Sequence, residues 1–234
     1  MTAALERATA RGELTPGQLK WALAQLSGRP RRADAVPERG DRRQEVLRVA
    51  TRVFLRRGYR RATIEEVASE LSLTKAGVYH YFRSKEEILE AICGNALAAS
   101  ERVILESLRG PGDAADRLRR LAQRYTELVM GDEALLVLSR HYDEVSEVAQ
   151  AQILKRRRRL LSLLRGVLEE GVVEGVFDIG DTGLAVACLF GMLSWLWTWY
   201  EPKGPVSPEG VRDALVRQLM HGVSADGDGQ AGTG

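Results

Sequence analysis

A short segment of the sequence, residues 74–82, combines hydrogen-bond donors with very small side chains. At helical spacing Val78 and Phe82 share an apolar face, so the other side chains point outward. Donors of this kind reach base edges and phosphates, and small residues let a helix come close to the bases. The residues that we predict to contact DNA here, with Thr74 as the helix N-cap, are Thr74, Lys75, Ala76, Gly77, Tyr79, His80 and Tyr81.

A second helix must precede this segment to position it. Thr63 and Glu66 have the spacing of a capping box. Apolar residues then recur at three- and four-residue intervals: Ile64, Val67, Ala68 and Leu71. Lys85 begins a third helix, where its side chain and the helix N-terminus could hold a phosphate together. Residues 63–85 therefore predict a helix-turn-helix; the alternative is a three-helix subdomain whose exposed tyrosines have no role.

Residues 41–59 add a preceding helix that Gly58 ends. With it, residues 41–90 closely resemble the DNA-binding domain of TetR-family transcriptional regulators, in RRGYRRATIEEVASELSLTKAGVYHYF followed by RSKEEIL. The resemblance implies an all-helical, homodimeric repressor whose recognition helix enters the major groove of a palindromic operator. The residues that it places at base contacts are Lys75, Gly77 and His80. Those that it places at backbone contacts are Thr63, Tyr79, Tyr81 and Lys85.

Composition sets looser limits. The net charge is only +2, but arginines concentrate at residues 42–61, where they could guide DNA or form a solvated helix face. Cys93 and Cys188 lie in apolar helical contexts and are expected to be buried thiols of a cytoplasmic protein. The spacing of the histidines predicts no metal site, and the N-terminal sequence predicts no secretion signal. His141 and Asp143 lie near each other without a nucleophile motif, so we predict no enzyme and no cofactor.

The all-α chain divides into four expected parts. Residues 1–40 form an extension that is partly helical or disordered, and residues 41–87 form the helix-turn-helix DNA-binding domain. Residues 88–223 form a helical effector-binding and dimerisation domain, and residues 224–234 a disordered tail. The helices expected at 182–200 and 208–222 have wide apolar faces, which predict a four-helix interface between two copies.

An alternative of another class depends on residues 183–200, which run without a charged residue. Their length is at the lower limit for a membrane span, and their aromatic end would suit a bilayer interface. Ser194 and Thr198 interrupt the stretch, and Asp178 and Asp181 precede it in place of a basic anchor. We therefore predict a subunit interface with a ligand cavity and no membrane partner, and a membrane-anchored helical protein remains the alternative.

Residues 194–223 resemble a narrower group, the TetR-family regulators of fatty-acid and steroid catabolism that release DNA on binding a CoA thioester. Those relatives often carry an arginine where this chain has Thr198, which puts a phosphate contact there in doubt. An acyl-CoA site needs an apolar tunnel with a basic mouth. The predicted ligand-binding residues are Trp195, Trp197, Trp199, Phe190, Met192, Arg158 and His141. A multidrug-type regulator that senses neutral or cationic hydrophobic compounds is the alternative, and tryptophans in the core with solvated arginines are the simplest interpretation.

Overall fold

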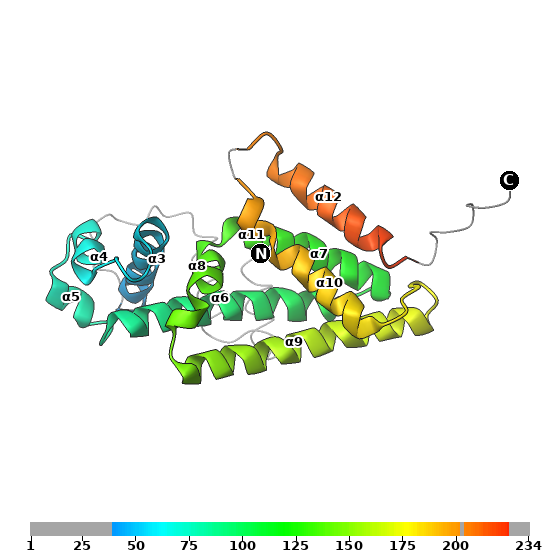
Figure 1. Cartoon of the computed structure of the whole chain (residues 1–234), viewed down its shortest axis with the longest axis horizontal. Coiled ribbons are helices and arrows are strands. Elements are labelled where there is room, and N and C mark those ends of the chain that lie inside the picture. The colour runs from blue at the N-terminus through cyan, green and yellow to red at the C-terminus, as the bar shows by residue number, and fades with distance from the viewer. Residues whose placement is uncertain (1–38, 202–203, 225–234) are drawn as a thin grey trace, which may run out of the picture. The chain divides into compact units, whose positions relative to one another are not determined.

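The computed structural model describes residues 39–201 and 204–224, and the described residues from 43 onward belong to one compact unit (Figure 1). The described helices are α3 (Arg39–Arg57), α4 (Ile64–Glu70), α5 (Lys75–Tyr79), α6 (Lys85–Leu108), α7 (Ala114–Gly131), α8 (Glu133–His141), the 3₁₀ turn η1 (Tyr142–Glu144), α9 (Glu147–Val173), α10 (Thr182–Ser194), α11 (Leu196–Trp199) and α12 (Pro208–His221). Within these ranges no strand forms, so the predicted all-α class is confirmed. Residues 1–38 of the predicted N-terminal extension and residues 225–234 of the predicted tail lie outside the described residues.

The predicted helix-turn-helix is present at the N-terminal end of α6 (Figure 1). Thr63 caps α4 in a complete capping box with Glu66, and the Thr74 side chain caps α5. The turn between the two helices contains Ser72 at φ 54. Val78 and Phe82 are buried as predicted, so one face of α5 is fixed against the core and the other is left for a partner.

The buried cluster beneath the helix-turn-helix also contains residues from other helices. It contains Phe54 of α3 and Val78 of α5, and the first turns of α6 contribute Ile88, Leu89 and Ile92. Because these α6 residues share one apolar cluster with α3, the start of α6 packs as one unit with the helix-turn-helix.

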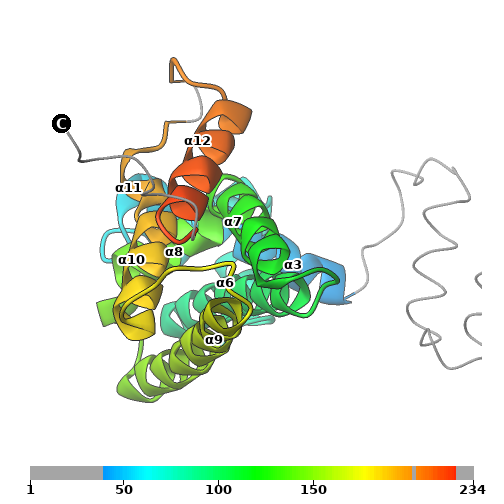
Figure 2. The same cartoon turned by 90° about the vertical axis from the view of Figure 1, so that its right-hand side faces the viewer.

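A second buried cluster holds the C-terminal part of the chain together. Helices α7, α8 and α9 pack against α6, α10 packs against α7 and α9, and α12 covers α7 (Figure 2). The apolar residues of α12 are buried within the same chain: Val211, Val216, Leu219 and Met220. The wide apolar face that we predicted for a subunit interface on α12 is therefore largely used inside the protomer.

Residues 182–200 do not form the single helix expected from their composition. The helix stops at Ser194 and resumes at Leu196, with Trp195 at the junction. Over Thr182–Trp199 the stretch is long and apolar enough to cross a membrane by length and composition, and 22% of it is buried in the protomer. Leu184 and Trp195 remain 66% and 64% exposed, so α10 presents an unpartnered apolar face.

Only one of the cysteines is buried as expected. Burial raises the pKa of the Cys93 thiol to about 12, which keeps it protonated and inert. Cys188 is exposed, contrary to the prediction, because α10 turns this side away from the protomer core.

Candidate DNA-binding surface and effector cavity

The outer face of the helix-turn-helix collects most of the predicted DNA-contacting residues. Those that are exposed are Thr63, Thr74, Lys75, Ala76, Tyr79 and His80, and those that are partly covered are Gly77 and Tyr81. The ring of Tyr81 packs on the domain core and stands edge-on to His80 at 5.1 Å. The surface thus offers hydroxyl, imidazole and ammonium groups around a strip of very small side chains.

Lys75 already has a partner on this surface. Its Nζ lies 2.6 Å from Glu65 Oε1 on α4, and this hydrogen bond raises the pKa of Lys75. Both side chains are more than half exposed, and an ion pair this open to water contributes little stability. Lys75 can therefore exchange Glu65 for a base edge or a phosphate at small cost.

Packing within the chain does not account for Gly77. A Cβ atom there would lie 3.5 Å from Leu73 and Thr74, which is ordinary van der Waals contact, and the backbone φ is not positive. Glycine in a helix costs roughly 1 kcal/mol relative to alanine. A close approach by an external surface to α5 would explain the absence of a side chain.

Lys85 has an internal role that its position in the sequence did not reveal. Its Nζ donates to the carbonyl oxygens of Tyr59, Arg60 and Ala62 at 3.0, 3.4 and 3.1 Å, and it stands 4.5 Å from the centre of the Tyr59 ring. These acceptors occupy all the N–H donors of an ammonium group. The predicted backbone contact with DNA would require this group to leave the α3–α4 loop.

The arginines near the helix-turn-helix fall into two sets. Arg56 and Arg57 pair with Glu70 and Glu66 of α4 and so join α3 to α4. Arg52, Arg61 and Arg83 form no ion pair with the described residues, and neither does Arg43, which lies 4.4 Å from the centre of the Phe82 ring. The arginines without an ion pair offer uncompensated charge to a phosphate backbone.

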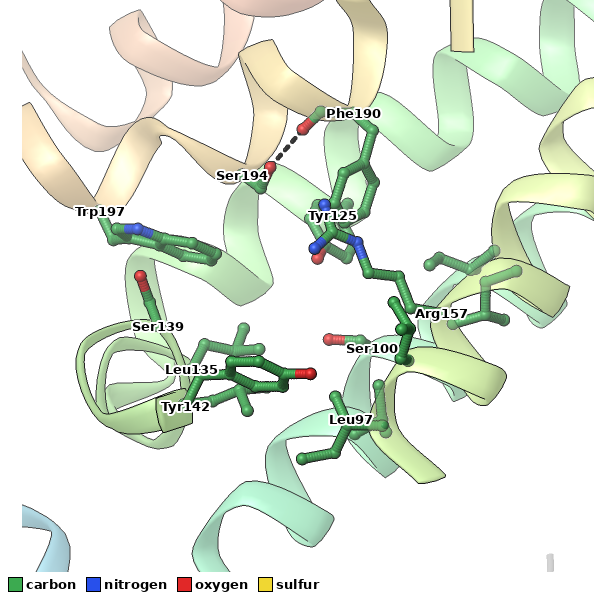
Figure 3. Close-up of a pocket in the computed structure, with 15 residues that line it drawn as sticks. Leu97, Ser100, Tyr125, Leu135, Ser139, Tyr142, Arg157, Phe190, Ser194 and Trp197 are labelled. Carbon is green, nitrogen blue, oxygen red and sulfur yellow. Dashed lines mark hydrogen bonds between the residues drawn. The ribbon is translucent and has the colours of Figure 1, made fainter. Parts of the chain in front are cut away.

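A cavity of about 310 Å³ lies in the C-terminal part, enclosed by α6 to α11 (Figure 3). It is lined by Leu97, Ser100, Ile104, Tyr125, Leu135, Leu138, Ser139, Tyr142, Ile153, Leu154, Arg157, Leu160, Phe190, Ser194 and Trp197. Among these, Ser139 of α8 and Leu154 and Arg157 of α9 are exposed, so the cavity meets solvent between α8 and α9. Its size and apolar walls are those of a small-molecule site.

The structure divides the predicted ligand-binding residues. Phe190 and Trp197 line the cavity. Those that lie outside its walls are Met192, Trp195, Trp199, Arg158 and His141. The helix break at Trp195 directs Trp197 inward and leaves its two neighbouring tryptophans exposed. On α9 the inward cation is Arg157, because successive helical residues point about 100° apart.

Several polar groups in the cavity wall are buried or have partners in the chain. Burial raises the pKa of the Tyr125 phenol. Tyr142 donates to the carbonyl oxygen of Gln150 at 3.3 Å, and the Ser194 hydroxyl donates to that of Phe190. Arg157 differs, since its guanidinium carbon lies 4.8 Å from the Phe190 ring centre and it forms no ion pair with the described residues. The cavity therefore offers one uncompensated positive charge in an apolar wall.

A short segment links this cavity to the DNA-binding domain. Tyr142 lines the cavity, while the preceding His141 ring lies 6.1 Å from the ring of Tyr59. Two residues further on, Glu144 Oε1 accepts a hydrogen bond of 2.7 Å from Arg60 Nε. The His141–Glu144 segment thus touches the cavity on one side and the α3–α4 loop on the other.

A helix-turn-helix joined to a helical domain with an apolar cavity is the architecture of one class of DNA-binding regulators. Comparison with known proteins gives the family. The family model described as "Bacterial regulatory proteins, tetR family" matches residues 46–92, and that described as "Tetracyclin repressor-like, C-terminal domain" matches residues 111–223. The chain belongs to the TetR family and is a transcriptional repressor of the TetR type, not an enzyme.

Individual relatives agree over most of the chain. The repressor KstR2 of Mycobacterium tuberculosis is 26% identical over 197 residues, covering 80% of this chain and 94% of its own. The crystal structure of the TetR-family regulator PfmR from Thermus thermophilus has a TM-score of 0.70 at 29% identity, covering 75% of this chain and 96% of its own. AibR, in complex with isovaleryl coenzyme A and operator DNA, has a TM-score of 0.70 at 24% identity, covering 76% of this chain and 98% of its own.

Proposed function

We propose that the chain acts in the cytoplasm as a homodimeric repressor that binds a palindromic operator and leaves it when a fatty acyl-CoA, or a related CoA thioester, binds. The cavity carries this proposal, because it joins an apolar interior to the uncompensated charge of Arg157 at the solvent side. An acyl group suits the apolar interior, and the anionic CoA suits the positive charge of Arg157. AibR has the same fold and binds isovaleryl coenzyme A, which supports this ligand class.

The DNA part of the proposal assigns α5 to the major groove. Thr74, Lys75, Ala76, Gly77 and His80 would face the bases, and Thr63, Tyr79 and Tyr81 would face the backbone. Lys85 would join them only by releasing the carbonyl oxygens of the α3–α4 loop. The exposed faces of α4 and α5 support this assignment, as does the absence of an internal reason for Gly77.

The dimer part assigns the exposed face of α10 to the twofold axis. Residues at helical spacing form its apolar stripe: Leu184, Ala187, Cys188, Gly191 and Trp195. Ala187 and Gly191 would let two copies of α10 approach closely. A subunit interface accounts for this exposed stripe in a DNA-binding regulator, and it replaces the membrane anchor that we kept as an alternative.

Operator selection from random DNA followed by effector titration tests the whole proposal. The full-length protein is expected to select an inverted repeat, to bind it with a strong salt dependence, and to release it when acyl-CoA is added. Equal binding to random DNA would contradict the regulator model. Release by neutral or cationic hydrophobic compounds, without a response to acyl-CoA, would instead support the multidrug-type alternative.

A further inference from the structure

A run of basic residues on α9 borders the opening of the cavity. Leu154 and Arg157 line the cavity and are exposed, so this turn of α9 forms the solvent side of the wall. Residues 155–159 read KRRRR, and of these only Arg156 forms an ion pair with the described residues, to Glu101 of α6. Like charges one turn apart destabilise a helix. The described part of the chain therefore leaves most of this positive charge uncompensated.

The side chains of this run point in different directions around α9. Arg158 follows Leu154 by four residues, which places both on one side of the helix, next to the opening of the cavity. It is exposed and forms no hydrogen bond or ion pair with the described residues. Arg159 points about 100° further round the helix. The hydrogen bond from Arg156, and then the charge of Arg159, lower the pKa of Glu101, so Arg159 faces the Glu101 side of α9.

Arg157 also keeps hydrogen-bond donors available at the opening. Its side chain extends from α9 towards Phe190, and its guanidinium carbon lies 4.8 Å from the centre of that ring (Figure 3). A guanidinium over a ring still presents N–H groups along its edge, where two of them can bind two oxygens of one phosphate. Two neighbouring arginines therefore match a ligand that carries several phosphate groups outside the cavity.

We propose that Arg158, together with Arg157, forms a phosphate-binding subsite at the opening of the cavity, and that this subsite selects CoA thioesters over thioesters without phosphates. The inference rests on the proposed acyl-CoA response and deepens it. The acyl chain occupies the apolar cavity, and the phosphates of CoA stay in solvent beside α9. Charge complementarity assigns them to this face, because the two arginines are exposed and form no ion pair with the described residues.

Direct titration of the full-length protein with matched thioesters measures the contribution of the phosphates. The acyl chain is the one that binds best in a saturated CoA series from butanoyl to palmitoyl, and it is presented on CoA and on pantetheine, which carries no phosphate. The wild type is expected to bind the CoA thioester roughly tenfold more tightly than the pantetheine thioester. This ratio should fall as salt is added, because the contact joins exposed charges.

Arg158→Gln is expected to reduce the ratio several-fold and to leave the affinity for the pantetheine thioester unchanged. Arg157→Gln should also reduce the ratio, and an unchanged ratio in this variant would overturn the pairing of the two arginines. Arg159→Gln is the matched control, since it removes the same charge from the same turn of α9 on the Glu101 side, and should keep the wild-type ratio. A wild-type ratio near one would overturn the subsite. An equal reduction by Arg159→Gln and Arg158→Gln would overturn it too, because it would show a general attraction by the basic run.

Operator release, measured beside binding, separates this inference from the proposed function. Thioester binding with the expected ratio but without operator release would contradict the proposed repressor response and support the subsite. Binding and release by the CoA and pantetheine thioesters at equal concentrations would contradict the subsite alone. Absence of binding by every thioester in the series would contradict both.

Discussion

At the scale of single residues, a substitution at Gly77 is expected to change the stability of the fold and the affinity for DNA in opposite directions. A Cβ atom at this position meets only ordinary contacts, so Gly77→Ala is expected to stabilise the fold by up to roughly 1 kcal/mol. If α5 lies against DNA, the same methyl group would clash there and weaken operator affinity roughly tenfold. Urea unfolding and fluorescence anisotropy measure the two effects. Gly94→Ala, in open space on α6, should give the stabilisation alone; unchanged operator affinity in Gly77→Ala would contradict the close approach.

His141 makes stability depend on pH. Burial, with a smaller contribution from Arg140, lowers its pKa from 6.5, and Glu144 partly opposes this shift. The folded chain therefore favours neutral His141, and the unfolded chain takes up the proton first as pH falls. This contribution to stability is complete above pH 6.5 and is lost as pH falls through the lower folded-state pKa.

His141→Gln should accordingly reduce the loss of unfolding free energy between neutral and mildly acidic buffer. Urea unfolding across that range measures the difference. His221→Gln, at an exposed position on α12, is the control and should follow the wild type. An unchanged pH profile in His141→Gln would show that the imidazole does not titrate with folding.

At the scale of elements, the His141–Glu144 segment is the contact between the cavity and the α3–α4 loop. The Arg60–Glu144 pair adds little stability, since Arg60 is 84% exposed. Because the pair joins the His141–Glu144 segment to the α3–α4 loop, we predict that it couples effector binding in the cavity to operator release. Glu144→Gln is expected to leave effector binding and folding nearly unchanged, and to raise the effector concentration needed for operator release several-fold.

Direct titration of the protein with effector, beside operator release, distinguishes weaker coupling from weaker binding. Arg165→Gln removes a comparable surface pair with Glu169 on α9 and should affect neither measurement. Equal weakening of effector binding and operator release in Glu144→Gln would place Glu144 in the ligand site and contradict the coupling role.

Elements also show how far the sequence predicts this molecule. The helix-turn-helix was predictable because its signals are local: the Thr63–Glu66 capping box, the Thr74 cap and short apolar spacings all act within a few residues. The residues that line the cavity were only partly predictable, because the rotation of each long helix about its axis decides which of its side chains face the cavity. One position along α9 separates Arg157 from Arg158, and the break at Trp195 separates Trp197 from its neighbours. Tyr125 and Ser100 come from helices whose pairing no local pattern specifies.

At the scale of the whole molecule, Cys188 reports on assembly. It is exposed in one protomer and lies within the apolar stripe of α10, whereas Cys93 is buried. In the native full-length protein both thiols are expected to resist a thiol reagent, because the twofold interface would cover Cys188. A Leu184→Arg variant should dissociate and expose one reactive thiol per chain, and denaturation should expose both.

Thiol counting combined with sedimentation checks this assignment. Rapid modification of Cys188 in a species that sediments as a dimer would place the interface on another surface. A Val173→Arg variant, at an exposed apolar position on α9, is the control and should leave both the assembly and the thiol count unchanged.

Helix α6 belongs to both buried clusters, with Ile88 and Leu89 in one and Ile104 and Leu108 in the other. Its 24 residues span about 36 Å at about 1.5 Å per residue. As a rigid lever of that length, it converts a tilt of about 5° at the cavity end into a displacement of about 3 Å at the helix-turn-helix. Two such levers moving apart in a dimer would change the separation of the recognition helices by about 6 Å, close to two base-pair steps of about 3.4 Å. An effector that shifts the cavity walls by less than the width of one atom would therefore suffice to take both recognition helices out of register with one operator.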